Sequence, residues 1–196
     1  MSAVMSVAGL VTIAAVTPGP NNLIVLRAAS RAGVRGALPA IAGVVLGGLA
    51  VLAVAFVASD AAFAAEPRLR IAAGGAGCLY LMWLGLGLIR GAERPSSGPA
   101  RGLPAASVAG LFSFQFLNPK SWVMVMTAIG AMPAGDAPWW SLGAVFTVIP
   151  ATCLLSWAIA GAALTRWLAQ PRIAVWVDRA MGVLLIATAI ALVELP

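Results

Sequence analysis

Charged residues are scarce in this chain, and histidine is absent from it. Lys and Arg together number 12 and Asp and Glu number 6 among 196 residues, so that 9% of the chain is charged and 62% is hydrophobic. A soluble domain carries about 25% charged residues. With a mean hydropathy of +1.00, the sequence predicts an integral membrane protein with little length left for a soluble domain.

These absences also exclude several chemistries. Without histidine there are no imidazole metal sites and no histidine proton relays. Cys78 and Cys153 stand in separate apolar segments, so neither a disulfide framework nor a metal spacing is visible, and no metal or cofactor is expected. An intramembrane enzyme would need a nucleophile or a metal set, and a pump would need a nucleotide-binding loop. Neither is present, so we expect a protein that is neither an enzyme nor an ATP-driven pump.

The net charge of +6 reflects topology rather than nucleic-acid binding, because the basic residues stand at the ends of apolar runs. The first run has no basic residue before it, which favours a transmembrane helix over a cleavable signal peptide.

Six segments are apolar over the ~20 residues that a bilayer requires, at about 3–26, 36–58, 69–90, 105–132, 138–165 and 173–194. The first, third and fifth connections hold eight basic residues, and the second and fourth hold two. The positive-inside rule therefore places the odd connections in the cytoplasm and both termini in the periplasm.

Two of these segments are interrupted by residues that disfavour helix. "TPGPNN" at 17–22 breaks the first, and Asn118–Pro119 breaks the fourth at a similar depth. Each half of the chain thus begins with a broken helix, and three helices per half put the second half in the opposite orientation. The predicted fold is all-α, with six transmembrane helices in two inverted three-helix repeats. The repeats, about 1–90 and 105–196, are joined by a cytoplasmic linker at 91–104 within one transporter domain.

The breaks have a chemical use. Breaking a helix frees N–H groups, which bind anions, and C=O groups, which bind cations. Such freed groups are tolerated at membrane depth only where protein or water satisfies them. A zwitterionic amino acid suits a pair of breaks, and Asn and Gln side chains beside them add donors and acceptors. One proline kink alone would favour a packing role, whereas two matched breaks favour a substrate site near the midplane.

At these residues the sequence resembles the lysine exporter (LysE/RhtB) family of bacterial amino-acid efflux proteins. The similarity lies in "TPGPNN", "SRAGVRGALPAIAGVVLGG", "GCLYLMWLGLGLIR" and "QFLNPKSW", in this order along nearly the whole chain. It implies a six-helix inner-membrane exporter of amino acids or close derivatives, coupled to the proton gradient. It also implies that the motif residues line the pathway: Thr17, Pro18, Gly19, Pro20, Asn21, Asn22, Gln115, Asn118, Pro119 and Lys120.

Lys120 and two further residues are also candidates on their own chemistry. Lys120 is the only lysine and lies deep in its segment, where a charge favours a function: attracting a carboxylate or losing a proton. The alternative is a side chain that snorkels along a water-filled vestibule. Asp178, next to Arg179, is either a proton carrier or, as we favour, part of an ion pair near the cytoplasmic interface. Tyr80 is a substrate contact or an inter-helix hydrogen bond, with equal weight.

Other functions stay open from the sequence alone. One is an exporter of a metal or another small ion, although the lack of His and of a Cys pair argues against a soft metal. Another is a membrane assembly subunit without transport, which leaves the two breaks unexplained. Gly43 and Gly47 predict close helix packing and leave a homodimer open. Apolar, hydroxylated and basic amino acids are all candidate substrates, with basic ones mildly disfavoured.

Overall fold

The computed structural model describes residues 2–59, 67–91, 106–131 and 139–193, and the regular structure in these ranges is helical throughout. The expected linker at 91–104 lies, apart from its first residue, outside the described residues. The helices are α1 (Ser2–Val16), α2 (Pro20–Ser59), α3 (Pro67–Gly91), α4 (Val108–Leu117), α5 (Pro119–Gly130), α6 (Trp139–Ala163), α7 (Thr165–Leu168) and α8 (Pro171–Val193).

Both predicted interruptions are confirmed. The chain is not helical between Val16 and Pro20, and a single non-helical residue, Asn118, separates α4 from α5. In each case a proline opens the second half-helix. Proline has no N–H and its ring fixes φ near −65°, so it fits the first helical position but not a helix interior.

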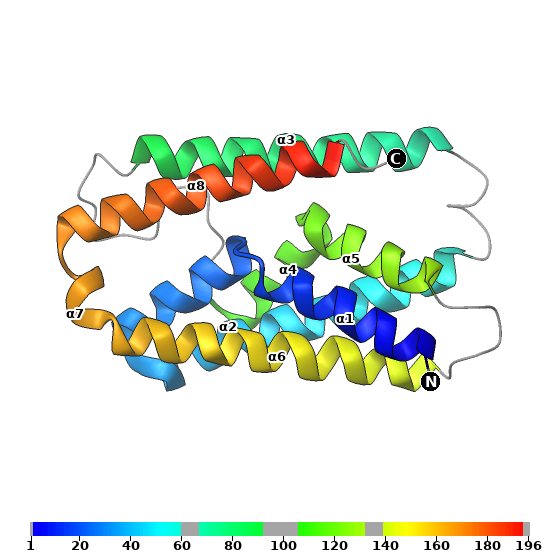
Figure 1. Ribbon diagram of the computed structural model, residues 1–196, viewed down its shortest axis with the longest axis horizontal. Helices are drawn as coiled ribbons and strands as arrows, with labels where there is room; N and C mark the ends of the chain where they lie inside the picture. Colours follow the sequence, from blue (N-terminus) through cyan, green and yellow to red (C-terminus); the bar gives the residue numbers. More distant parts are fainter. Residues whose placement is uncertain (1, 60–66, 92–105, 132–138, 194–196) are drawn as a thin grey trace.

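The first predicted connection, 27–35, is shorter than expected and is reduced to a kink between two helical segments. The structure continues α2 through it, with a kink at Ala32 and Gly33. Gly33 has φ 68° and ψ 178°, a combination that is essentially restricted to glycine. Two residues therefore suffice to reverse the chain, and Figure 1 shows α2 running toward one end of the molecule and then back.

The helices form two groups. In Figure 1 α3 and α8 lie side by side along one edge, and α1, α2, α4, α5 and α6 form the rest. Glycines permit the closest approaches between helices. A Cβ added at Gly85 of α3 would lie 2.7 Å from the Gly182 carbonyl oxygen of α8, and one added at Gly182 would lie 2.6 Å from the Gly85 oxygen. Backbones this close pack well without a hydrophobic driving force between them.

Length and composition make three of the described helices able to cross a membrane: Pro20–Val57, Trp140–Ala163 and Pro171–Ile190. Ala3–Val16, Cys78–Arg90 and Val108–Leu117 are shorter apolar helices. The kink of α2, the end of α3 and α7 all lie at the left of Figure 1, and the beginning of α1 and the end of α8 lie toward the right. These three places, the kink of α2, the end of α3 and α7, thus lie at one end of the molecule.

Candidate substrate site at the two helix breaks

The two breaks lie against each other around one cavity of about 60 Å³. Its walls come from α1, both parts of α2, α4, α5 and α6. The lining residues are Ala14, Ala15, Gly19, Pro20, Asn21, Asn22, Val44, Gly48, Gln115, Asn118, Lys120, Ser121, Met124, Phe146, Pro150 and Leu154.

A reciprocal pair of amides joins the two halves of the chain. Asn21 Nδ2 donates to Gln115 Oε1 at 3.0 Å, and Gln115 Nε2 donates to Asn21 Oδ1 at 3.1 Å, across 94 positions of sequence. Gln115 Nε2 also donates to the Leu111 carbonyl at 3.0 Å, and Ser121 Oγ donates to Gln115 Oε1 at 2.8 Å. Gln115 is 1% exposed, so its hydrogen-bonding capacity is met inside the protein.

The carbonyls freed at the end of α1 are held by cationic and amide donors. Lys120 Nζ donates to the Thr17 carbonyl at 2.7 Å, so an ammonium group from α5 sits at the negative end of α1. Asn22 Nδ2 donates to Ala15 O at 3.1 Å and to Thr17 O at 3.2 Å. Cys153 of α6 adds its thiol, 3.1 Å from Ala15 O. The carbonyl groups at the end of α1 therefore bind a cationic group, the Lys120 ammonium.

The second break is closed by its own neighbours. Asn118 Oδ1 accepts from the Lys120 backbone N–H at 3.2 Å, which caps the beginning of α5. Trp122 Nε1 donates to the Phe116 carbonyl at 2.9 Å, near the end of α4. Asn118 is 1% exposed, yet its side chain lies at the cavity wall.

The structure gathers most of the predicted site residues. Those that line the cavity are Gly19, Pro20, Asn21, Asn22, Gln115, Asn118 and Lys120. Thr17 contributes its carbonyl to Lys120 but turns its hydroxyl to the Ile13 carbonyl. Pro18 and Pro119 shape the breaks and are not among the lining residues.

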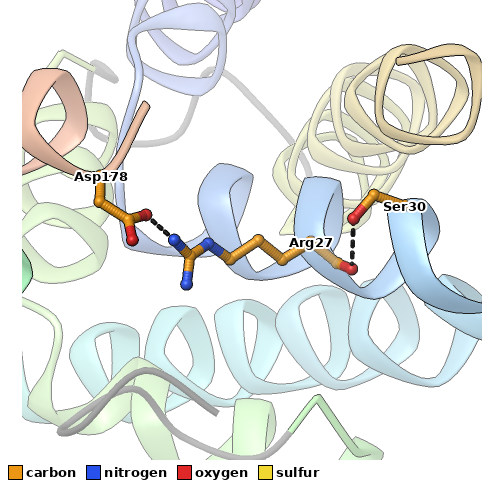
Figure 2. A network of polar contacts seen from close by, with 3 residues as sticks. All are labelled: Arg27, Ser30 and Asp178. Atoms are coloured by element: carbon orange, nitrogen blue, oxygen red, sulfur yellow. Dashed lines mark hydrogen bonds and ion pairs between the residues drawn. The ribbon is translucent and has the colours of Figure 1, made fainter. Parts of the chain in front are cut away.

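Tyr80 and Asp178 also lie outside this lining. The Tyr80 ring packs between Trp83 and Phe114, with centroids 5.8 and 6.0 Å away. Asp178 forms an ion pair with Arg27 of α2, whose backbone carbonyl accepts a hydrogen bond from Ser30 (Figure 2). The ion pair that the sequence favours for Asp178 is therefore present, with its partner in α2. Adjacent helical side chains diverge, and Arg27 reaches Asp178 from another helix.

Sequence reasoning missed Ser121 and the α6 side of the cavity. Ser121 stands two residues after Pro119, as Asn22 stands two after Pro20, and this matched spacing could have revealed it. Phe146 and Leu154 look like any other residues of an apolar helix. Only Pro150, which lies inside α6, distinguishes this helix in the sequence. A proline does not indicate which other helix its own helix faces.

The family model of the LysE type translocator matches residues 12–194. The chain belongs to the LysE type translocator family. A similar protein of this family is a cysteine/O-acetylserine efflux protein of Klebsiella pneumoniae, 28% identical over 156 residues and 76% of each chain. Another, with the same name, is from Escherichia coli K12, 29% identical over 157 residues, 76% of this chain and 77% of that one. No solved structure matches.

This membership confirms the resemblance seen in the motifs. The LysE type translocator described here is a multi-pass protein of the inner membrane, in keeping with its apolar helices. The names of its relatives support the predicted class of function, efflux of an amino acid or a close derivative.

Proposed function

We propose that this translocator is a secondary active exporter of an amino acid or a close derivative, driven by the proton gradient, and that the two helix breaks form its substrate site. The observation that carries the proposal is the contact between the breaks. Asn21 of one break pairs with Gln115 beside the other, and Lys120 caps the Thr17 carbonyl across 103 positions.

A zwitterion fits the groups at this cavity. Its carboxylate is attracted by the Lys120 ammonium and by the first N–H groups of α2, which no helical carbonyl can reach. Its ammonium is suited to the carbonyl end of α1, where Thr17 O and Ala15 O already accept from nitrogen donors. Bound substrate would thus replace the hydrogen bond between Lys120 and Thr17 with its own bonds to these two groups. The empty and the loaded site would then differ in the hydrogen bonds that join the two halves of the chain.

The packing pattern supports an inverted repeat of six spans. α1 packs on α6, and its counterpart α4 packs on α2; α3 packs on its own counterpart α8. α5 contacts α3, and correspondingly α2 contacts α8 through Arg27 and Asp178. These pairs of contacts correspond to each other when the halves are exchanged, as expected for repeats that form a site at their interface. With the arginine-rich connections in the cytoplasm, both termini face the periplasm.

The site is tested with Asn21→Ala, Asn118→Ala and the double variant, in cells that lack other exporters and are loaded with labelled amino acids. Each single change removes amide bonds worth roughly 1–2 kcal/mol, so export should fall about tenfold at unchanged abundance in the membrane. Because both side chains serve one cavity, the double variant should be less damaging than the product of the single effects. Normal export by both single variants would show that the breaks are packing features.

A further inference from the structure

We propose that Gly48 sets the size of the substrate side chain that this translocator accepts, and that this side chain carries no positive charge. The inference rests on the proposed function, since it assumes that the cavity at the breaks binds the substrate. Gly48 lies on the second part of α2, among the cavity-lining residues. Val44, four residues before it, also lines the cavity, and residues four apart lie on one face of a helix.

Gly48 differs from the two glycines before it in what surrounds it. A Cβ added at Gly43 would lie 2.5 Å from the Val108 carbonyl oxygen, and one added at Gly47 would lie 2.6 Å from that of Phe112. Those two glycines are needed for the approach of α4. A Cβ added at Gly48 would meet no heavy atom within 4 Å.

The backbone does not require glycine at this position either. Among the described residues only Gly33 has a positive φ. Glycine is disfavoured in a helix interior relative to alanine, and at Gly48 neither a close helix approach nor the backbone conformation requires it; unlike Gly143, it lines the cavity. The space that its missing side chain leaves free belongs to the cavity.

The chemistry of the lining indicates what occupies this space. The polar groups come from the breaks and from Ser121, whereas the walls from the second part of α2 and from α6 are apolar, including Val44, Phe146 and Leu154. Gly48 shares the face of Val44 and so belongs to the apolar wall. Lys120 is the one charged residue among those that the structure places around the cavity. A cationic side chain would find no counterion there and a like charge nearby, which is unfavourable away from water.

The test uses the purified full chain in proteoliposomes, with labelled L-serine, O-acetyl-L-serine, L-leucine and L-lysine as probes. We expect transport of uncharged probes and none of L-lysine. Gly48→Val should lower transport of the larger uncharged probes relative to L-serine by about tenfold, the effect of one or two methyl groups in an apolar pocket. Gly48→Ala should fall between Gly48→Val and the unchanged chain.

Two matched variants separate pocket size from folding. A Cβ added at Gly143 of α6 also meets nothing within 4 Å, and Gly143 does not line the cavity, so Gly143→Val should leave the ratio between probes unchanged. Gly47→Val should instead lower abundance, because it collides with α4.

The outcomes distinguish this inference from the function on which it rests. If Asn21→Ala lowers transport but Gly48→Val leaves the ratio between probes unaltered, the role of Gly48 is overturned and the proposed site stands. Transport of L-lysine as fast as L-serine would overturn the exclusion of cationic side chains. If Asn21→Ala transports every probe normally, the substrate site and the role of Gly48 both fail.

Discussion

The two helix breaks occupy matching places in the two halves of the chain, but they are stabilised differently. The first, Thr17–Gly19, has a local donor in Asn22 and also takes donors from far along the sequence: Lys120 at the Thr17 carbonyl and Cys153 at Ala15. The second consists of Asn118 alone and is closed locally, by its own amide and by Trp122. A break of one residue leaves few unpaired groups, and neighbours can cap them.

The longer break leaves more carbonyls unpaired and therefore requires the other half of the chain to be in place. Its second half-helix has an additional attachment, since Arg27 of α2 pairs with Asp178 of α8. In α5 the corresponding half-helix carries no charged residue beyond Lys120, so it cannot form such a pair. We infer that changes in the contact between the halves disturb the first break more than the second.

The largest effect is expected for Gln115→Ala, because this residue serves both breaks. Its side chain takes part in four hydrogen bonds and is 1% exposed. Its loss leaves Asn21 and Ser121 without these partners and opens a void, so export should fall about 100-fold, with some loss of thermal stability. Gln170→Ala, at an exposed glutamine, is the matched control. Export within a few fold of the unchanged chain would contradict a shared site.

A smaller and more local effect is expected for Lys120→Met. It removes the donor to the Thr17 carbonyl while leaving the backbone N–H that Asn118 caps. Export should fall about tenfold, and Lys120→Arg, which keeps a charge and donors, should retain part of it.

Hydrogen–deuterium exchange of the same variant sharpens the comparison of the breaks. In Lys120→Met the hydrogen-bonded amides at the first break, Thr17 and Leu23, should exchange faster, while those of Ser121 and Trp122 at the second change little. Equal acceleration at both breaks would show that the second is not locally closed.

The smallest effect is expected at the Arg27–Asp178 ion pair, whose side chains are 21% and 15% exposed. Arg27→Ala and Asp178→Ala should each lower thermal stability in detergent, by about 1 kcal/mol. The double variant should be no worse than the more harmful single change, because each change removes the same pair. Additive losses would mean that the two residues act through different partners.

Much of this architecture is predictable from the sequence because its causes are local. Apolar runs of membrane length predict spanning helices, and proline beside asparagine predicts both breaks and the residues at them. The kink at Ala32–Gly33 was harder to predict. Several arginines suggested a longer connection, whereas the positive φ of Gly33 lets the chain reverse over two residues.

What the sequence by itself determined is therefore the apolar character, the family and the positions of the breaks, since each follows from the residue types within one segment. Which partners meet was decided by the tertiary structure. That Asn21 pairs with Gln115, that Asp178 pairs with Arg27, and that Gly48 faces open space while Gly47 touches α4 all depend on how helices rotate and approach each other. Side-chain packing between distant segments sets these rotations, and no local pattern in the chain specifies them.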